Sequence, residues 1–143
     1  MKRFRFTLQK LYDVKQSEEK RQRARLKELN QNLLNYSNQL KANRSIFDAQ
    51  QSIYREKCKA GMEMREVRQF GDYLQYLEKE MRRQKNVIAS CEKSIGECRS
   101  GLLKLINEQH VLERMREEQY IAYMKEVQKS DDRMIEDFMQ ARY

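Results

Sequence analysis

The most reactive side chains in this sequence are three cysteines and one histidine. Cys58, Cys91 and Cys98 could act as nucleophiles or, together with His110, ligate a zinc ion. Such a zinc site needs a CxxC pair and a fourth ligand, and the sequence has neither. We therefore expect no metal site. Cys91 and Cys98 are better explained as small buried packing residues, and His110 as a surface residue.

The other chemical signatures of an enzyme are also missing from the sequence. There is no GxxxxGK[ST] phosphate loop and no GxGxxG dinucleotide fingerprint. The carboxylates are spread along polar stretches, and a structure two helices thick should offer almost no concave volume for a substrate. The sequence therefore predicts a protein that is not an enzyme, with no cofactor and no small-molecule substrate.

The composition indicates long helices. The 143 residues include no proline and only four glycines, so most of the residues that end helices are absent. Charged residues make up 36% and the mean hydropathy is -1.04, which is too polar for a thick globular core. Hydrophobic residues still make up 39%, too many for a disordered chain. One domain that buries a narrow stripe of side chains fits both values.

Two stretches carry a coiled-coil stripe with alternating spacings of three and four residues. The first stripe consists of Leu26, Leu29, Leu33, Tyr36, Leu40, Asn43, Phe47, Gln50 and Tyr54. The second consists of Phe70, Leu74, Leu77, Met81, Gln84, Ile88, Cys91, Ile95, Cys98, Leu102, Leu105, Gln109 and Leu112. Their polar members either set the register or mark a stretch where a partner docks. Upstream, Phe4, Leu8 and Leu11 form a shorter stripe.

The segment between the stripes contains Gly61, which is suited to end a helix, with Lys57 and Lys59 in the last turn before it. The fold class expected is all-α, an antiparallel two-helix coiled-coil hairpin that forms a rod, with the second helix longer. We expect one domain over 1–143, a first helix over 3–58, a turn over 59–65 and a second helix over 66–140. The alternative is one continuous helix with Gly61 inside it.

The second helix should extend past the first as a C-terminal overhang of about fifteen residues, as the difference in helix lengths implies. Beyond Leu112 its stripe turns polar, and a neighbouring set of positions takes over: Tyr120, Met124, Val127, Asp131, Met134 and Phe138. This set should face something other than the first helix. Without a partner we expect 135–143 to fray.

Positive charge is concentrated near the N-terminus. Residues 1–29 carry ten Lys/Arg and four Asp/Glu, a net of +6, whereas residues 113–143 carry six and eight, a net of -2. Three explanations are open: a solvated helix face, a contact with an acidic partner surface, or nucleic-acid binding. Arg21, Arg23 and Arg25 point in different directions around a helix, which makes nucleic acid the least favoured. Near the predicted turn, Tyr73 and Tyr76 either pack beside the stripe or anchor a partner.

The cellular location is indicated by features that the sequence lacks. No run of 18 apolar residues could span a membrane, and the basic start of the chain is not followed by the apolar stretch of a signal peptide. Cys91 and Cys98 are too far apart on one helix to form a disulfide, which indicates reduced thiols and the cytosol.

Two segments resemble a known family. FRFTLQKLYDVK, residues 4–15, resembles the opening of the flagellar type III export stalk protein, the FliJ family, and FGDYLQYLE, residues 70–78, resembles the start of its second helix. The resemblance covers essentially the whole chain. It implies an antiparallel coiled-coil hairpin similar to the rotor stalk of rotary ATPases.

The resemblance also implies partners and sites. Proteins of this family insert the terminal end of the hairpin into the hexameric export ATPase and promote its assembly, bind the linker of the export-gate membrane protein, and interact with export chaperones. This places the protein in the cytoplasm, at the cytoplasmic face of the inner membrane through its partners. The implied ATPase contacts are Lys15, Lys20, Arg21, Arg23 and Arg25, and the implied gate contacts are Gln39, Ile46, Tyr73, Leu77 and Gln84. The rival hypotheses are a generic self-associating coiled-coil scaffold and a basic nucleic-acid-binding rod.

Overall fold

The computed structural model describes residues 2–142 and contains two helices. Helix α1 spans Gln9–Ala60 and helix α2 spans Met64–Arg142, with 52 and 79 residues. No strand occurs within residues 2–142. The predicted all-α hairpin with a longer second helix is confirmed. None of the helices in this range is long and apolar enough to cross a membrane.

A three-residue turn, 61–63, joins the helices. Gly61 has a φ of 92°, in the left-handed region that favours glycine, and Lys57 and Lys59 lie in the last turn of α1. The backbone N–H of Val67 donates to the carbonyl of Glu63 at 3.1 Å in the first turn of α2. The alternative of one continuous helix is therefore wrong. Gly61 ends the first helix, as its position between the two stripes indicated.

The helix bounds differ from those predicted, most at the N-terminus. Helix α1 begins at Gln9 rather than at residue 3, and the turn is shorter than the range 59–65. Phe4 therefore precedes the helix, and Leu11 is 43% exposed, so the expected stripe of Phe4, Leu8 and Leu11 does not form. Helix α2 continues through Arg142, two residues past the predicted end and through most of the segment expected to fray.

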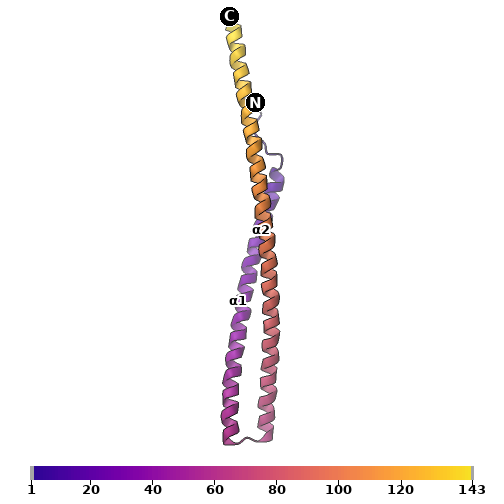
Figure 1. Ribbon diagram of the computed structural model, residues 1–143, viewed down its shortest axis with the longest axis vertical. Coiled ribbons are helices and arrows are strands. Elements are labelled where there is room, and N and C mark those ends of the chain that lie inside the picture. The colour runs from indigo at the N-terminus through magenta and orange to yellow at the C-terminus, as the bar shows by residue number, and fades with distance from the viewer. Residues whose placement is uncertain (1, 143) are drawn as a thin grey trace. The chain divides into compact units, whose positions relative to one another are not determined.

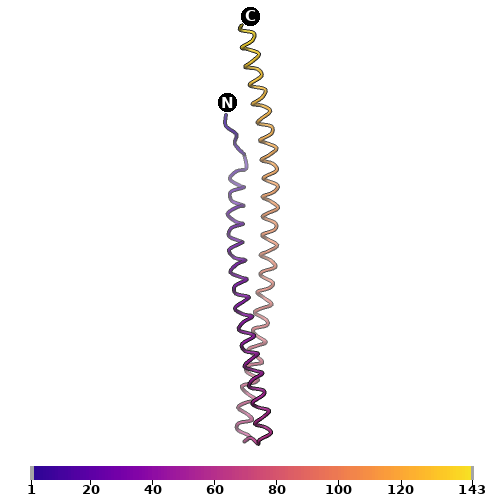
Figure 2. The backbone as a smooth tube through the Cα atoms, turned by 90° about the vertical axis from the view of Figure 1, so that its left-hand side faces the viewer, coloured from indigo at the N-terminus to yellow at the C-terminus, as the bar shows by residue number. Residues whose placement is uncertain are grey.

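The chain divides into two compact units. The hairpin unit comprises residues 24–99, and the terminal unit comprises residues 1–23 and 100–143. In the hairpin unit the parts of α1 and α2 that flank the turn lie side by side and antiparallel (Figures 1 and 2). In the terminal unit the start of the chain lies along the later part of α2.

The predicted stripes form the core of both units. Every member of the first stripe is half-buried, and every member of the second is buried or half-buried. In the hairpin unit the rings of Tyr54 and Phe70 pack with centroids 5.9 Å apart. The thiol of Cys91 donates to the carbonyl of Leu29 at 3.5 Å. Cys91 and Cys98 are buried, as their stripe positions indicated.

Candidate functional site

The non-helical start of the chain, residues 2–8, packs against α2 in the terminal unit; we call it the N-terminal strap. Phe6 is its buried anchor, only 7% exposed. The Phe4 ring meets Tyr120 edge-on, with centroids 5.3 Å apart, and also packs against Tyr123 at 5.5 Å. The Tyr123 hydroxyl donates to the carbonyl of Lys2 at 2.8 Å. Aromatic packing and this hydrogen bond thus hold the strap on α2.

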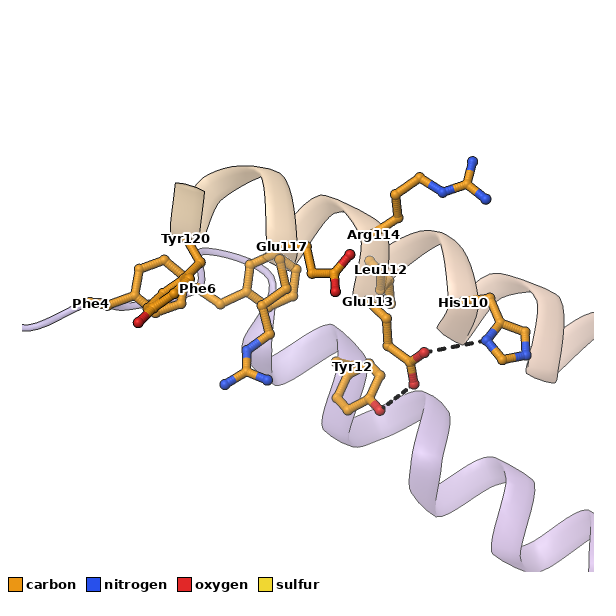
Figure 3. A pocket seen from close by; sticks show the side chains of 10 residues that line it. Phe4, Phe6, Tyr12, His110, Leu112, Glu113, Arg114, Glu117 and Tyr120 are labelled. Atoms are coloured by element: carbon orange, nitrogen blue, oxygen red, sulfur yellow. Dashed lines mark hydrogen bonds and ion pairs between the residues drawn. The ribbon is translucent and has the colours of Figure 1, made fainter. Parts of the chain in front are cut away.

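A groove of about 750 Å³ lies between the strap, the first turn of α1 and α2 (Figure 3). Its apolar lining comes from Phe4, Phe6, Leu112 and Tyr120. Its polar lining consists of Tyr12, His110, Glu113, Arg114, Arg116 and Glu117. The expectation of almost no concave volume is therefore wrong for this unit. Two straight helices would leave little space, and it is the extended strap beside α2 that encloses the groove.

Glu113 is the polar centre of the groove wall. Its carboxylate accepts a hydrogen bond from the Tyr12 hydroxyl at 2.8 Å and lies 3.3 Å from His110 Nδ1 (Figure 3). The hydrogen bond from Tyr12, followed by that from His110, lowers the pKa of Glu113 below the usual value. The same bond raises the pKa of Tyr12. His110 thus makes a surface hydrogen bond, and within residues 2–142 no cluster of metal-ligating side chains surrounds it.

This geometry predicts a pH-dependent effect of Glu113→Gln. Because folding lowers the pKa of Glu113, its stabilising contribution is present above the unfolded value of about 4.5 and is lost as pH falls through the lowered value. The variant should therefore be slightly less stable than wild type at pH 7, and the difference should vanish in acid. Urea unfolding at several pH values checks this.

The matched control for this pH series is Glu118→Gln, an exposed site on the same helix. It should leave stability unchanged at every pH. A deficit of Glu113→Gln that stays constant down to acidic pH would contradict the assigned role of the carboxylate.

The five ATPase-contact candidates differ in how accessible they are to a partner. Lys15 is half-buried, and its ammonium pairs with Glu108 at 2.8 Å, an ion pair that raises the pKa of Lys15 and lowers that of Glu108. Arg23 is exposed and pairs with Glu19 at 3.2 Å on its own helix. Lys20 and Arg21 are exposed in the terminal unit, and Arg25 is exposed in the hairpin unit. Lys15 therefore serves the internal packing, whereas the others face solvent.

The five gate-contact candidates all belong to the hairpin unit, and the structure separates them into two groups. Gln39, Ile46 and Tyr73 are exposed, the last two at 42% each. Leu77 and Gln84 are 3% and 6% exposed, so they form part of the core between the helices. The neighbouring Tyr76 is 61% exposed, so the aromatic side chains expected near the turn do reach the surface.

The sequence analysis did not predict the strap or its buried Phe6, because it placed the start of the first helix at residue 3. The alternation Phe4-Arg5-Phe6 was the available signal, since it places both rings on one side of an extended segment. The exposed apolar positions at the end of α2 were anticipated as facing away from the first helix. Among them, Met124, Met134 and Phe138 are 45%, 68% and 70% exposed.

Comparison with known proteins identifies the family. A family model described as the flagellar FliJ protein matches residues 4–143. The chain belongs to the flagellar FliJ family. No curated protein and no solved structure matches the chain. Members of the FliJ family are non-catalytic components of the flagellar export apparatus, and this agrees with the hairpin of α1 and α2.

Proposed function

We propose that this FliJ-family chain is a central-stalk-like component that binds the hexameric export ATPase and promotes its assembly and activity. The family match over residues 4–143 carries the proposal. The two arms of the terminal unit support it. One presents Lys20, Arg21 and Arg23, and the other presents an apolar face with no partner within residues 2–142. A protein without an active site can act on a ring enzyme in this way, by contacting its subunits unequally.

We further propose that the chain contacts the linker of the export-gate membrane protein and export chaperones. The exposed positions Gln39, Ile46 and Tyr73 would meet the linker directly, with Tyr76 beside them. Leu77 would act indirectly, by holding the two helices of the hairpin unit together, and Gln84 would act indirectly through its buried position between them. In this role the protein would work in the cytoplasm, held at the inner membrane by its partners.

The ATPase part of the proposal predicts a charge effect. Reversing Arg21 and Arg23 to glutamate should raise the chain concentration needed for half-maximal ATPase stimulation by about tenfold at low salt, because charge steers association. The effect should shrink as salt increases. The measurement is ATP turnover by the cognate export ATPase, with ring assembly followed by light scattering.

The matched control reverses Lys41 and Arg44, two exposed cations of the hairpin unit, with the same change in net charge. Equal losses of ATPase stimulation in both variants would mean that the change in net charge alone causes the effect. Wild-type chain that changes neither turnover nor assembly would refute the proposed function.

A further inference from the structure

A second hollow of the terminal unit, of about 660 Å³, is lined by three cations; we call it the cationic hollow. Arg5 of the strap, Lys10 in the first turn of α1 and Arg116 of α2 all contribute to its wall. Among residues 2–142 no aspartate or glutamate lines it. Its volume lies in the range of small-molecule binding sites.

The three cations of this hollow have no ion-pair partner within residues 2–142. Further along α1, by contrast, the ammonium of Lys15 lies 2.8 Å from the carboxylate of Glu108. Glu113 and Glu117 line the neighbouring groove but not the cationic hollow, and Glu113 is already paired within that groove. The positive charge of the hollow is therefore not balanced by an ion pair from the described part of the chain.

The start of the chain adds to this positive charge. Residues 2–10 carry four Lys/Arg and no Asp/Glu. Helix α1 has no acidic residue in its first turn, so the positive end of its dipole is not offset there. Asp13, the first carboxylate of α1, lies just beyond that turn and accepts a hydrogen bond from the Gln9 side chain at 3.0 Å. A concave surface lined by one sign of charge concentrates ions of the opposite sign.

The strap leaves Arg5 free to contact a ligand. Phe4 packs on Tyr120 and Tyr123 of α2, and Phe6 is buried. Because side chains alternate along an extended segment, Arg5 lies on the other side of the strap, and it is exposed. Its guanidinium group therefore lines the hollow without taking part in the packing of the strap.

We propose that the cationic hollow binds a compact oligophosphate anion, such as tripolyphosphate or the phosphate tail of a nucleotide. Such an anion carries several negative charges in one small group, which matches three cations around one hollow. Arg5 and Arg116 would make forked hydrogen bonds to phosphate oxygens, and Lys10 would supply a point charge. Because the three cations come from the strap, α1 and α2, a bound anion would join these three elements.

Other anionic partners fit the hollow less well. Neighbouring side chains on a helical peptide have β-carbons about 5–6 Å apart, so an acidic protein segment would bring fewer charges into it. A nucleic-acid strand continues with a phosphate about every 3.4 Å and would meet Glu117 and Glu118, which follow Arg116 on α2 and would repel it. A bilayer surface is flat, whereas these cations surround a hollow.

Isothermal titration calorimetry of the full chain with tripolyphosphate, in low salt and without divalent cations, tests the proposal. We expect a single site with a dissociation constant of about 50 µM, weakened about tenfold at physiological salt. Arg5→Gln and Arg116→Gln should each weaken binding about fivefold, and the double variant about twentyfold or more. No detectable binding to wild type at about 1 mM tripolyphosphate would overturn the proposal.

The matched control removes the same charge from the hairpin unit. Lys41→Gln combined with Arg44→Gln, at two exposed positions, should leave the affinity within about twofold of wild type. Circular dichroism reports whether each variant keeps its helices. Equal weakening in the two double variants would mean that net charge alone attracts the anion, and it would exclude a site at the hollow.

Two competing ligands test the class of anion. Tripolyphosphate should bind about tenfold more tightly than a hexaglutamate peptide. Tighter binding of the peptide would assign the hollow to an acidic protein segment. Cosedimentation with phosphatidylglycerol vesicles that the wild type shows and the variant Arg5→Gln with Arg116→Gln lacks would assign it to a membrane surface. Either result would overturn the proposal of a soluble oligophosphate.

Hydrogen exchange locates the bound anion on the chain. Tripolyphosphate should slow exchange of the backbone amides of the strap about threefold or more, because it joins the strap to both helices. Exchange in the turn 61–63 should not change. Equal slowing in both segments, or in neither, would contradict binding at the hollow. Since no ATPase is present in these experiments, their outcomes are independent of the proposed stalk function.

Discussion

Replacing Gln84 by leucine should raise the free energy of unfolding by about 1–3 kcal/mol. Gln84 is 6% exposed, and its side-chain Oε1 is buried with no hydrogen-bond partner. A buried amide oxygen without a partner costs free energy in the folded state, because it gives up its hydrogen bonds to water. Leucine has a similar size and suits a coiled-coil position, so it removes the cost without leaving a cavity.

Urea unfolding followed by circular dichroism measures this gain. Gln75→Leu is the control, because Gln75 is exposed on the same helix and its replacement should change stability by less than about 0.5 kcal/mol. An unchanged or lower stability of Gln84→Leu would mean that the amide oxygen has a partner in solution, such as an ordered water.

The same variant separates two roles for Gln84 at the proposed gate surface. If Gln84 acts only through the packing of the hairpin unit, the stabilised variant should bind the gate linker as well as wild type does. Weaker binding by a more stable protein would show that the partner reaches the amide directly, which requires the helices to separate locally.

Truncating Leu77 to alanine should have the largest effect on stability, a loss of about 2–5 kcal/mol. Leu77 is 3% exposed, the lowest value among the buried hydrophobic residues. The truncation removes buried methyl groups and leaves a cavity that two packed helices can close only in part. Urea unfolding again measures the loss.

Two further variants serve as controls for Leu77→Ala. Leu77→Met preserves volume and should cost less than about 1.5 kcal/mol. Leu103→Ala, at a position that is 60% exposed, should cost less than about 0.5 kcal/mol. If Leu77→Ala proved as mild as Leu103→Ala, the packing of the hairpin unit described here would be wrong.

The buried positions bear on how the gate surface should be probed. Loss of linker binding in Leu77→Ala would not by itself establish a contact, because the variant also loosens the hairpin unit. Tyr73→Ala is the more informative change, since Tyr73 is 42% exposed and its removal leaves the core intact. An effect on binding at unchanged stability would identify a direct contact.

Both stripes and the turn were predictable from the sequence. Spacings of three and four residues place side chains on one side of a helix, and each predicted member from Leu26 to Tyr54 and from Phe70 to Leu112 is at least half-buried. Gly61 was recognisable because its residue type alone tolerates the backbone angle that ends α1. These features depend on local geometry, which the order of residues specifies directly.

The strap, its groove and the partners of the charged residues were decided by tertiary structure. Phe6 is buried in an extended segment whose Phe4 ring packs against Tyr120 and Tyr123, more than a hundred residues later in the chain. The alternation Phe4-Arg5-Phe6 indicates a buried side but not which distant surface covers it. Likewise, the sequence alone does not show that Lys15 forms an ion pair with Glu108. A repeating pattern determines which side of a helix is buried, whereas the register between two distant segments determines which individual side chains meet.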